Sequence, residues 1–261
     1  MIRRALFLGA ALGASSVAAW GLAVRPWWRS WGVVPAEAER PLPGDDLVAD
    51  PSVTETRAIT IDAPPETVWP WLAQMGYGRA GWYSYDQLDM DGHSSDYIDA
   101  RWQALDVGTV LATHPGGGFV VRVLEPGRAL GLYIDTELAT EQAAAAKAAN
   151  TGLETAPANV RRTGGMLASA TPPDFKVSWT FVLEPTDAGS TRLIERIRGT
   201  FVVPDRPTVR GRDPMQMAWP LMGFGVFVMM RKQLLGIKAR VEGFGGAEER
   251  PVITPAPQPA A

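Results

Sequence analysis

A regular alternation of apolar and polar residues in the second half of the chain places the strongest constraint on the fold. Its apolar members are Phe175, Val177, Trp179, Phe181 and Leu183. Alternation with period two is typical of a strand that buries one face. Residues 187–190 (Asp-Ala-Gly-Ser) form a turn signal, and residues 191–203 follow as a second strand-like segment. The two segments predict an antiparallel β-hairpin.

The rest of the chain adds strands and two helices to this hairpin. Further strands are predicted at residues 56–62, 107–113, 118–125 and 129–135. Apolar residues recur at helical spacing from residue 65 to residue 75, where Gly76 ends the helix. Residues 213–242 predict a long apolar helix. This order indicates one α+β domain with an antiparallel sheet packed on its C-terminal helix.

The N-terminus resembles a membrane segment. Residues 5–24 contain no charged residue, and twenty helical residues span about 30 Å, the thickness of a bilayer core. Four tryptophans between Trp20 and Trp31 would form an interfacial aromatic belt. We expect an N-terminal hydrophobic helix that anchors the chain, with the body extracytoplasmic. A signal peptide cleaved near Ala19, which would leave a secreted protein, is the alternative, and a buried soluble helix is a third possibility.

These patterns divide the chain into four parts. Residues 1–31 are the anchor or signal segment, and residues 32–55 are expected to form a linker, because they are rich in Pro, Gly and acidic residues. Residues 56–243 form the domain, and residues 244–261 form a proline-rich, disordered tail. Within the domain, residues 137–173 are an insertion with an alanine-rich helix, which we interpret as an exposed excursion that could act as a lid.

Composition excludes several kinds of chemistry. The chain has no cysteine and only two histidines, so it lacks a thiolate nucleophile, a disulfide framework and a multi-histidine metal site. A net charge of −3 argues against a nucleic-acid-coating protein. We expect no metal, no cofactor and no nucleic-acid partner.

Two residues are weak candidates for acid–base catalysis. In residues 193–198, Leu193, Glu195 and Ile197 share one strand face and the arginines take the other. If the arginines face water, Glu195 points inward, where a carboxylate must be paired or protonated. His93 lies close in sequence to Asp86 and Asp96 and could exchange protons with them.

Residues 59–72, Ile-Thr-Ile-Asp-Ala-Pro-Pro-Glu-Thr-Val-Trp-Pro-Trp-Leu, resemble the opening strand and helix of the START-like (SRPBCC) superfamily. That superfamily includes polyketide cyclase/dehydratase-like and lipid-transfer proteins, and the resemblance covers residues 56–242. Residues 81–86 and 235–238 resemble a bacterial branch that often carries an N-terminal hydrophobic segment. The resemblance implies a helix-grip fold, in which a curved antiparallel sheet wraps around the C-terminal helix and leaves a deep apolar cavity. It implies no shared catalytic motif, because one fold hosts many functions.

We therefore expect membrane-associated binding of a hydrophobic small molecule or lipid in an internal cavity, without assigned catalysis. Methionine side chains adapt to variable apolar ligands, and five of the nine lie between residues 215 and 230. The expected ligand-binding residues are Trp82, Tyr83, Tyr85, Trp179, Phe181, Trp219, Met222 and Val226. One alternative is a cyclase or dehydratase that uses His93 and Glu195. Another is a protein-interaction module that docks a partner on the sheet or the long helix.

Overall fold

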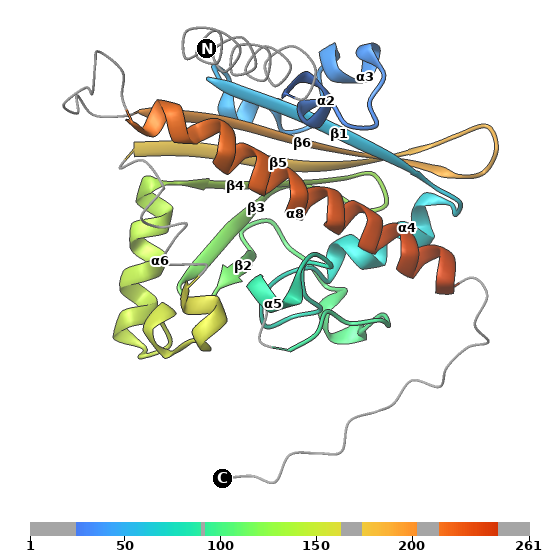
Figure 1. Ribbon diagram of the computed structural model, residues 1–261. Helices are drawn as coiled ribbons and strands as arrows, with labels where there is room; N and C mark the ends of the chain where they lie inside the picture. Colours follow the sequence, from blue (N-terminus) through green and yellow to red (C-terminus); the bar gives the residue numbers. More distant parts are fainter. Residues whose placement is uncertain (1–24, 90–91, 163–173, 203–213, 245–261) are drawn as a thin grey trace, which may run out of the picture.

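A six-stranded antiparallel sheet and a C-terminal helix dominate the computed structural model of the protein (Figure 1). The structure describes residues 25–89, 92–162, 174–202 and 214–244, with only the backbone for residues 25–26, 89, 153, 202, 214–222 and 244. The strands are β1 Val53–Ile61, β2 Val110–His114, β3 Gly117–Glu125, β4 Ala129–Asp135, β5 Asp174–Pro185 and β6 Thr191–Val202. They are arranged in the order β1-β6-β5-β4-β3-β2. This confirms the α+β class and each predicted strand.

The described helices are α2 Arg25–Arg29, α3 Pro35–Glu39, α4 Pro65–Ala73, α5 Asp86–Asp89, α6 Thr136–Ala148 and α8 Pro214–Phe244, with 3₁₀ turns at Asp45–Val48, Ala100–Trp102 and Leu153–Thr155. Helix α8 crosses one face of the sheet and contacts α4 near its C-terminal end (Figure 1). The predicted helices at residues 65–75 and 213–242 are therefore confirmed. Helix α4 ends three residues before Gly76, which adopts a positive φ of 131°.

The core lies between α8 and the inner face of the sheet. Leu130, Leu132 and Leu193 are fully buried there against Leu234 and Ile237 of α8. The close approach of α8 to the backbone of Tyr83 depends on Gly236, because a Cβ at this position would lie 2.2 Å from the carbonyl oxygen of Tyr83. A closely packed core of this kind fixes the position of the second half of α8 over the sheet.

The outer face of the sheet corrects the linker prediction for residues 32–55. Leu42 and Val48 are buried against this face, and Ala58 in β1 donates a backbone hydrogen bond to Trp31 (3.1 Å). Arg196 of β6 does not face water but is buried, and donates to Asp45 (2.7 Å) and to backbone carbonyls of residues 37, 38 and 40. Two of the acidic residues that make the segment resemble a linker are partners for arginines of β6, Glu37 for Arg192 and Asp45 for Arg196. The segment packs as part of the domain, and β1 begins at Val53 rather than after residue 55.

The insertion is only partly as expected. Helix α6 buries no side chain, in agreement with an exposed excursion. It is attached to the sheet, however, because Gln142 Oε1 accepts a hydrogen bond from the backbone N–H of Gly118 (2.7 Å). Residues 163–173 of the insertion lie outside the described residues.

Both ends of the chain also lie outside the described residues, and with them the hydrophobic helix expected at residues 1–31, except for its last part, and the proline-rich tail. No helix among the residues that the structure describes is long and apolar enough to cross a membrane.

Candidate functional site

A buried carboxyl group marks the inner face of the sheet. Glu195 of β6 is fully buried, which confirms that it points inward. Its Oε1 accepts a hydrogen bond from the indole N–H of Trp179 (2.7 Å) on neighbouring β5. Its Oε2 is buried and has no hydrogen-bond partner among the described residues. An unpartnered buried acceptor is uncommon in folded proteins and calls for an explanation.

The surroundings of Glu195 change its ionisation. Burial raises the pKa of the Glu195 carboxyl to about 7, although nearby Arg57 and the hydrogen bond from Trp179 lower it and Glu55 adds to the rise. Burial dominates because a charged carboxylate loses its hydration in an apolar site. Near neutral pH, the group therefore exchanges between a protonated form, which can donate a hydrogen bond, and a charged form, which only accepts.

Two charged residues of β1 complete the buried cluster. Arg57 pairs with Glu195 in the β1–β6 register and is fully buried, while Glu55 lies two residues earlier on the same face. Arg57 donates to Glu55 (2.5 Å), to the carbonyl of Trp28 (3.3 Å) and to the sulfur of Met230 on α8 (3.1 Å). The guanidinium therefore connects the sheet, α2 and α8 in one place. Sequence reasoning missed both residues, although Arg57 stands on the apolar face of its strand by the same alternation that identified Glu195.

Trp179, the hydrogen-bond partner of Glu195, lies in a cluster of aromatic rings. Trp179 stacks on Trp82 with ring centroids 5.1 Å apart, and it contacts Phe181 at 5.1 Å and Phe119 at 5.5 Å. The Trp82 indole N–H donates to the carbonyl of Ala112 (3.1 Å), and Phe181 is fully buried. The structure therefore brings together three of the predicted ligand-binding residues, Trp82, Trp179 and Phe181, around Glu195.

Helix α8 contributes a second unpartnered acceptor. Gln233 is buried, and its amide N–H contacts the sulfur of Met75 (3.6 Å), but its Oε1 has no hydrogen-bond partner within the described part of the chain. It was not predicted from sequence; the signal available was one polar residue on the buried face of an apolar helix. Among the described residues, one acceptor on α8 and one on β6 are thus buried without a donor.

Val226 is exposed although it lies on the inward side of α8. Val226 precedes Gln233 by seven residues, which is two helical turns, so both side chains lie on the same side of α8. Gln233 is 2% exposed but Val226 is 37% exposed. An apolar side chain on the inward side of a helix is exposed only where nothing fills the space next to it. The predicted ligand-binding residue Val226 therefore lies where the helix–sheet interface reaches solvent, and we call this place the opening beside Val226. Trp219 and Met222, predicted for the same site, have side chains outside the described residues.

The two tyrosines behave differently from the tryptophans. Tyr83 is buried between α4 and α8, where its hydroxyl donates to the Trp71 carbonyl (3.1 Å) and accepts from Gln74 (2.9 Å), and Arg240 lies over its ring. Burial raises the pKa of the Tyr83 hydroxyl far above its usual range. These contacts make Tyr83 a structural residue rather than one free to meet a ligand. Tyr85 is 40% exposed and lies outside the buried cluster.

His93 does not join Glu195. Its side chain is 94% exposed in a surface loop, with Nδ1 3.6 Å from Asp86. The partner carboxylate Asp86 also accepts a hydrogen bond from Ser94 (2.5 Å), so the group holds the loop together. The interpretation of His93 as a cavity acid or base is therefore not supported by its position, because an acid–base group must lie within hydrogen-bond reach of the reacting atoms.

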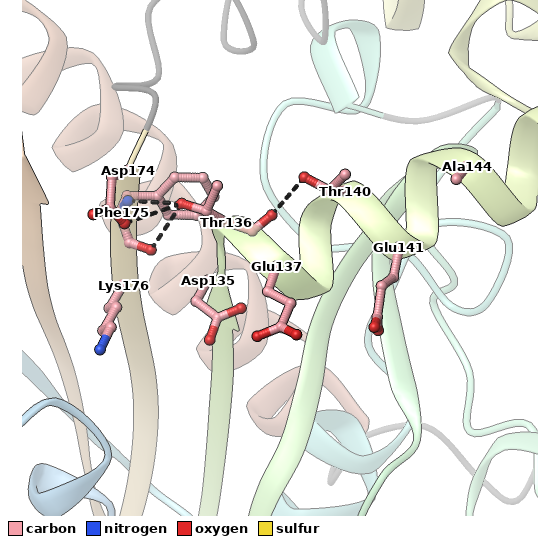
Figure 2. Close-up of a pocket in the computed structure, with 9 residues that line it drawn as sticks. All are labelled: Asp135, Thr136, Glu137, Thr140, Glu141, Ala144, Asp174, Phe175 and Lys176. Carbon is pink, nitrogen blue, oxygen red and sulfur yellow. Dashed lines mark hydrogen bonds between the residues drawn. The ribbon is translucent and has the colours of Figure 1, made fainter.

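An open groove of about 630 Å³ lies at a different place, where the start of α6 meets the ends of β4 and β5 (Figure 2). Its acidic lining residues are Asp135, Glu137, Glu141 and Asp174, against a single base, Lys176. Asp135 caps α6 by accepting from the backbone of Leu138 (2.9 Å) and also accepts from Tyr133 (3.0 Å), while Thr136 joins α6 to β5 through Phe175 (2.9 Å). Because this groove is open to solvent and its charged lining residues are mainly acidic, it is poorly suited to burying an apolar ligand. Within the described ranges, this groove included, no group of three or more acidic or histidine residues could hold a metal ion.

The sequence matches no protein-family model and no curated protein. Among solved structures, the chain is similar to protein MLL2253 from Mesorhizobium loti, with 15% identity over 73% of this chain and 98% of that one, and a TM-score of 0.37. It is also similar to protein CV1439 from Chromobacterium violaceum, with 14% identity over 72% of this chain and 96% of that one, and a TM-score of 0.34. Similarity at this level does not bear on function, which must be argued from the site itself.

Proposed function

We propose that the protein is a membrane-associated member of the START-like (SRPBCC) superfamily with a helix-grip fold, and that it binds a hydrophobic small molecule or lipid between the sheet and α8. Catalysis is not part of this proposal. The observation that carries it is the buried, unpartnered Oε2 of Glu195 in a ring of aromatic side chains. Such an atom is explained by a ligand group that completes its hydrogen bonding.

The ligand has to be mainly apolar with a polar end. Trp179 and Phe119, which are only partly buried, offer apolar surface, whereas Glu195 and Gln233 offer hydrogen-bond acceptors. Ligand sites in proteins commonly combine an apolar lining with a few polar groups that fix orientation. The opening beside Val226 gives such a molecule a route under the first half of α8, where the sequence is rich in methionine.

Uptake of a fluorescent fatty acid by the full-length protein tests this proposal. Val226→Trp should fill the opening and reduce binding at least tenfold. Val107→Trp places the same ring at another exposed valine, 61% exposed, outside the proposed route, and should bind as the wild type does. Native mass spectrometry of the purified protein should also detect a co-purifying lipid. A wild type that takes up no probe, or a Val226→Trp variant that binds normally, would overturn the proposal.

One observation favours a second function, a cyclase or dehydratase. The pKa of Glu195, raised by burial to about 7, is close to the value that general acid–base catalysis needs at neutral pH. Under this function, Glu195→Gln abolishes the loss of water from a bound β-hydroxy ketone, as followed by mass spectrometry. Under simple binding, no such reaction occurs in the wild type either, and the variant still takes up the fluorescent fatty acid.

Membrane association is the second part of the proposal. We infer a single N-terminal span at residues 5–24, with the domain outside the cytoplasm, and secretion after signal cleavage as the alternative. The support is the uncharged run in the sequence, which has the length of a bilayer span. Carbonate-resistant association of the full chain with membranes supports the anchor, and a mature N-terminus near Ala19 would refute it.

A further inference from the structure

Helix α2 connects the apolar N-terminal run directly to the body of the domain. It begins at Arg25, the residue that follows the uncharged residues 5–24. Trp28 in α2 is 3% exposed and packs on Phe224 and Phe227 of α8, with ring centroids 6.5 Å and 6.2 Å away. A Cβ at Gly223 would lie 2.8 Å from the Trp28 ring, so this glycine makes room for it. No linker in the sequence separates the end of the apolar run from α2, which packs on the domain.

Aromatic and basic groups are exposed around the contact between α2 and α8. Trp27 is 54% exposed, although the edge of its ring contacts Phe227 at 5.4 Å. Further along α8, Arg231 and Lys232 are exposed, and the Arg231 guanidinium lies over the ring of Trp31 (5.0 Å). We call Trp27, Val226, Arg231 and Lys232 the α2 patch. Tryptophan and basic side chains together are typical of surfaces that rest at a membrane interface with anionic headgroups.

We propose that the α2 patch rests on the surface of a bilayer that contains anionic lipids, so that the opening beside Val226 faces the lipid. This rests on the membrane association proposed above and specifies which face of the domain meets the membrane. The lipid is favoured as the occupant because a span at residues 5–24 would end at the patch without a spacer, and because its basic residues complement anionic headgroups. The ligand would then pass between the bilayer and the site without crossing water.

The absence of cysteine makes a direct test possible. Single-cysteine variants Trp27→Cys and Val226→Cys of the full-length protein are labelled with an environment-sensitive fluorophore and reconstituted into vesicles of phosphatidylcholine and phosphatidylglycerol. Lipids carrying a nitroxide near the headgroup should quench both probes several-fold more strongly than a probe at Val107→Cys. Val107 is a matched control because it is exposed and precedes β2, at the opposite edge of the sheet from β1.

Three other results of the quenching experiment would overturn the proposal, and each has a different cause. Equal quenching at positions 27, 226 and 107 would mean that the domain has no preferred face, even if the chain is anchored. A blue-shifted probe at 226 without quenching by lipid would mean that protein, for example residues 5–24, covers the patch. A chain that does not enter vesicles would refute membrane association as well, while the fatty-acid test of ligand binding stays independent.

Discussion

Trp179 donates its indole N–H to one carboxyl oxygen of Glu195, while the other oxygen has no hydrogen-bond partner in the part of the chain that the structure describes. The two residues lie on neighbouring strands, and Trp179 is in turn stacked on Trp82. A packed ring therefore fixes the direction in which the free oxygen points. A buried acid held in this way responds to pH and to any group that enters the site.

Replacing Glu195 with glutamine should stabilise the protein at neutral and alkaline pH. The pKa of the carboxyl is raised from 4.5 to about 7 on folding, so the folded state holds a proton that the unfolded state has lost between these values. The unfolding free energy of the wild type therefore falls by up to about 3 kcal/mol as the pH rises from 4.5 to about 7. Above about pH 7, this group causes no further loss. Glu195→Gln removes this loss.

Urea unfolding at a series of pH values measures this difference. The gap in unfolding free energy between Glu195→Gln and wild type should grow from about pH 4.5 and level off above about pH 7. His93→Ala serves as a control, because its exposed side chain should leave the pH profile within about 0.5 kcal/mol of wild type. A gap that does not vary with pH would contradict the ionisation assigned to Glu195.

Trp179→Phe should move the ionisation of Glu195 to higher pH. The hydrogen bond from Trp179 lowers the carboxyl pKa, and phenylalanine keeps an aromatic ring but has no N–H. We compare the unfolding free energy of Trp179→Phe with that of the double variant Trp179→Phe/Glu195→Gln. The difference between them should continue to grow above pH 7. Trp82→Phe also loses an indole hydrogen bond, to Ala112, and should leave that range unchanged. Each substitution costs about 1–3 kcal/mol of stability.

Arg57→Met should destabilise the protein far more than Arg192→Met. Removing the buried guanidinium leaves Glu195 without its nearby cation and Glu55 with only the longer contact to Arg29 (3.8 Å), which costs about 3–5 kcal/mol. Arg192 pairs with Glu37 in a partly exposed position, where loss of the pair costs about 1 kcal/mol. Denaturant unfolding at pH 8 measures the unfolding free energy of both variants. Equal losses relative to the wild type would contradict the stabilising role of Arg57 in the buried charge cluster.

Gly32→Ala tests the docking of the N-terminal segment. Gly32 has a φ of +75°, and a Cβ there would lie 2.1 Å from the carbonyl oxygen of Ala58. Gly78 has nearly the same φ of +71° but open space around it, so Gly78→Ala reports the backbone strain alone, about 1 kcal/mol. Gly32→Ala should cost at least about 1 kcal/mol more in thermal unfolding. Equal costs would mean that the segment is not held against β1.

The main elements of the fold could be predicted from sequence because their periodicity is strong. The β5–β6 hairpin alternates cleanly, and the same alternation correctly directed Glu195 inward. Helix α8 was recognisable from its length and apolar character. Local patterns of this kind need no knowledge of distant contacts.

The remaining features depend on contacts far apart in sequence. Glu37 and Asp45 are partly buried partners for arginines about 150 residues away, and no local pattern shows such pairing. His93 was selected for its neighbours in sequence, but its loop turns it toward solvent. Tyr83 has the composition of a ligand-site residue, yet contacts from α4 and α8 fix it in place. Composition indicates which groups are available, whereas tertiary packing decides which of them meet.

The backbone hydrogen bond from Ala58 to Trp31 also affects whether the β1 edge can pair with a strand of another molecule. Edge strands with free N–H and C=O groups recruit further strands and lead to aggregation. Here residue 31 covers the β1 edge, and at the other edge the carbonyl of Ala112 in β2 accepts from Tyr77 (2.7 Å) and Trp82 (3.1 Å). The chain thus blocks addition of a strand at both edges. A fragment that begins after Val33 would release the β1 edge and should self-associate, whereas one that begins at Arg25 should stay monomeric at the same concentration.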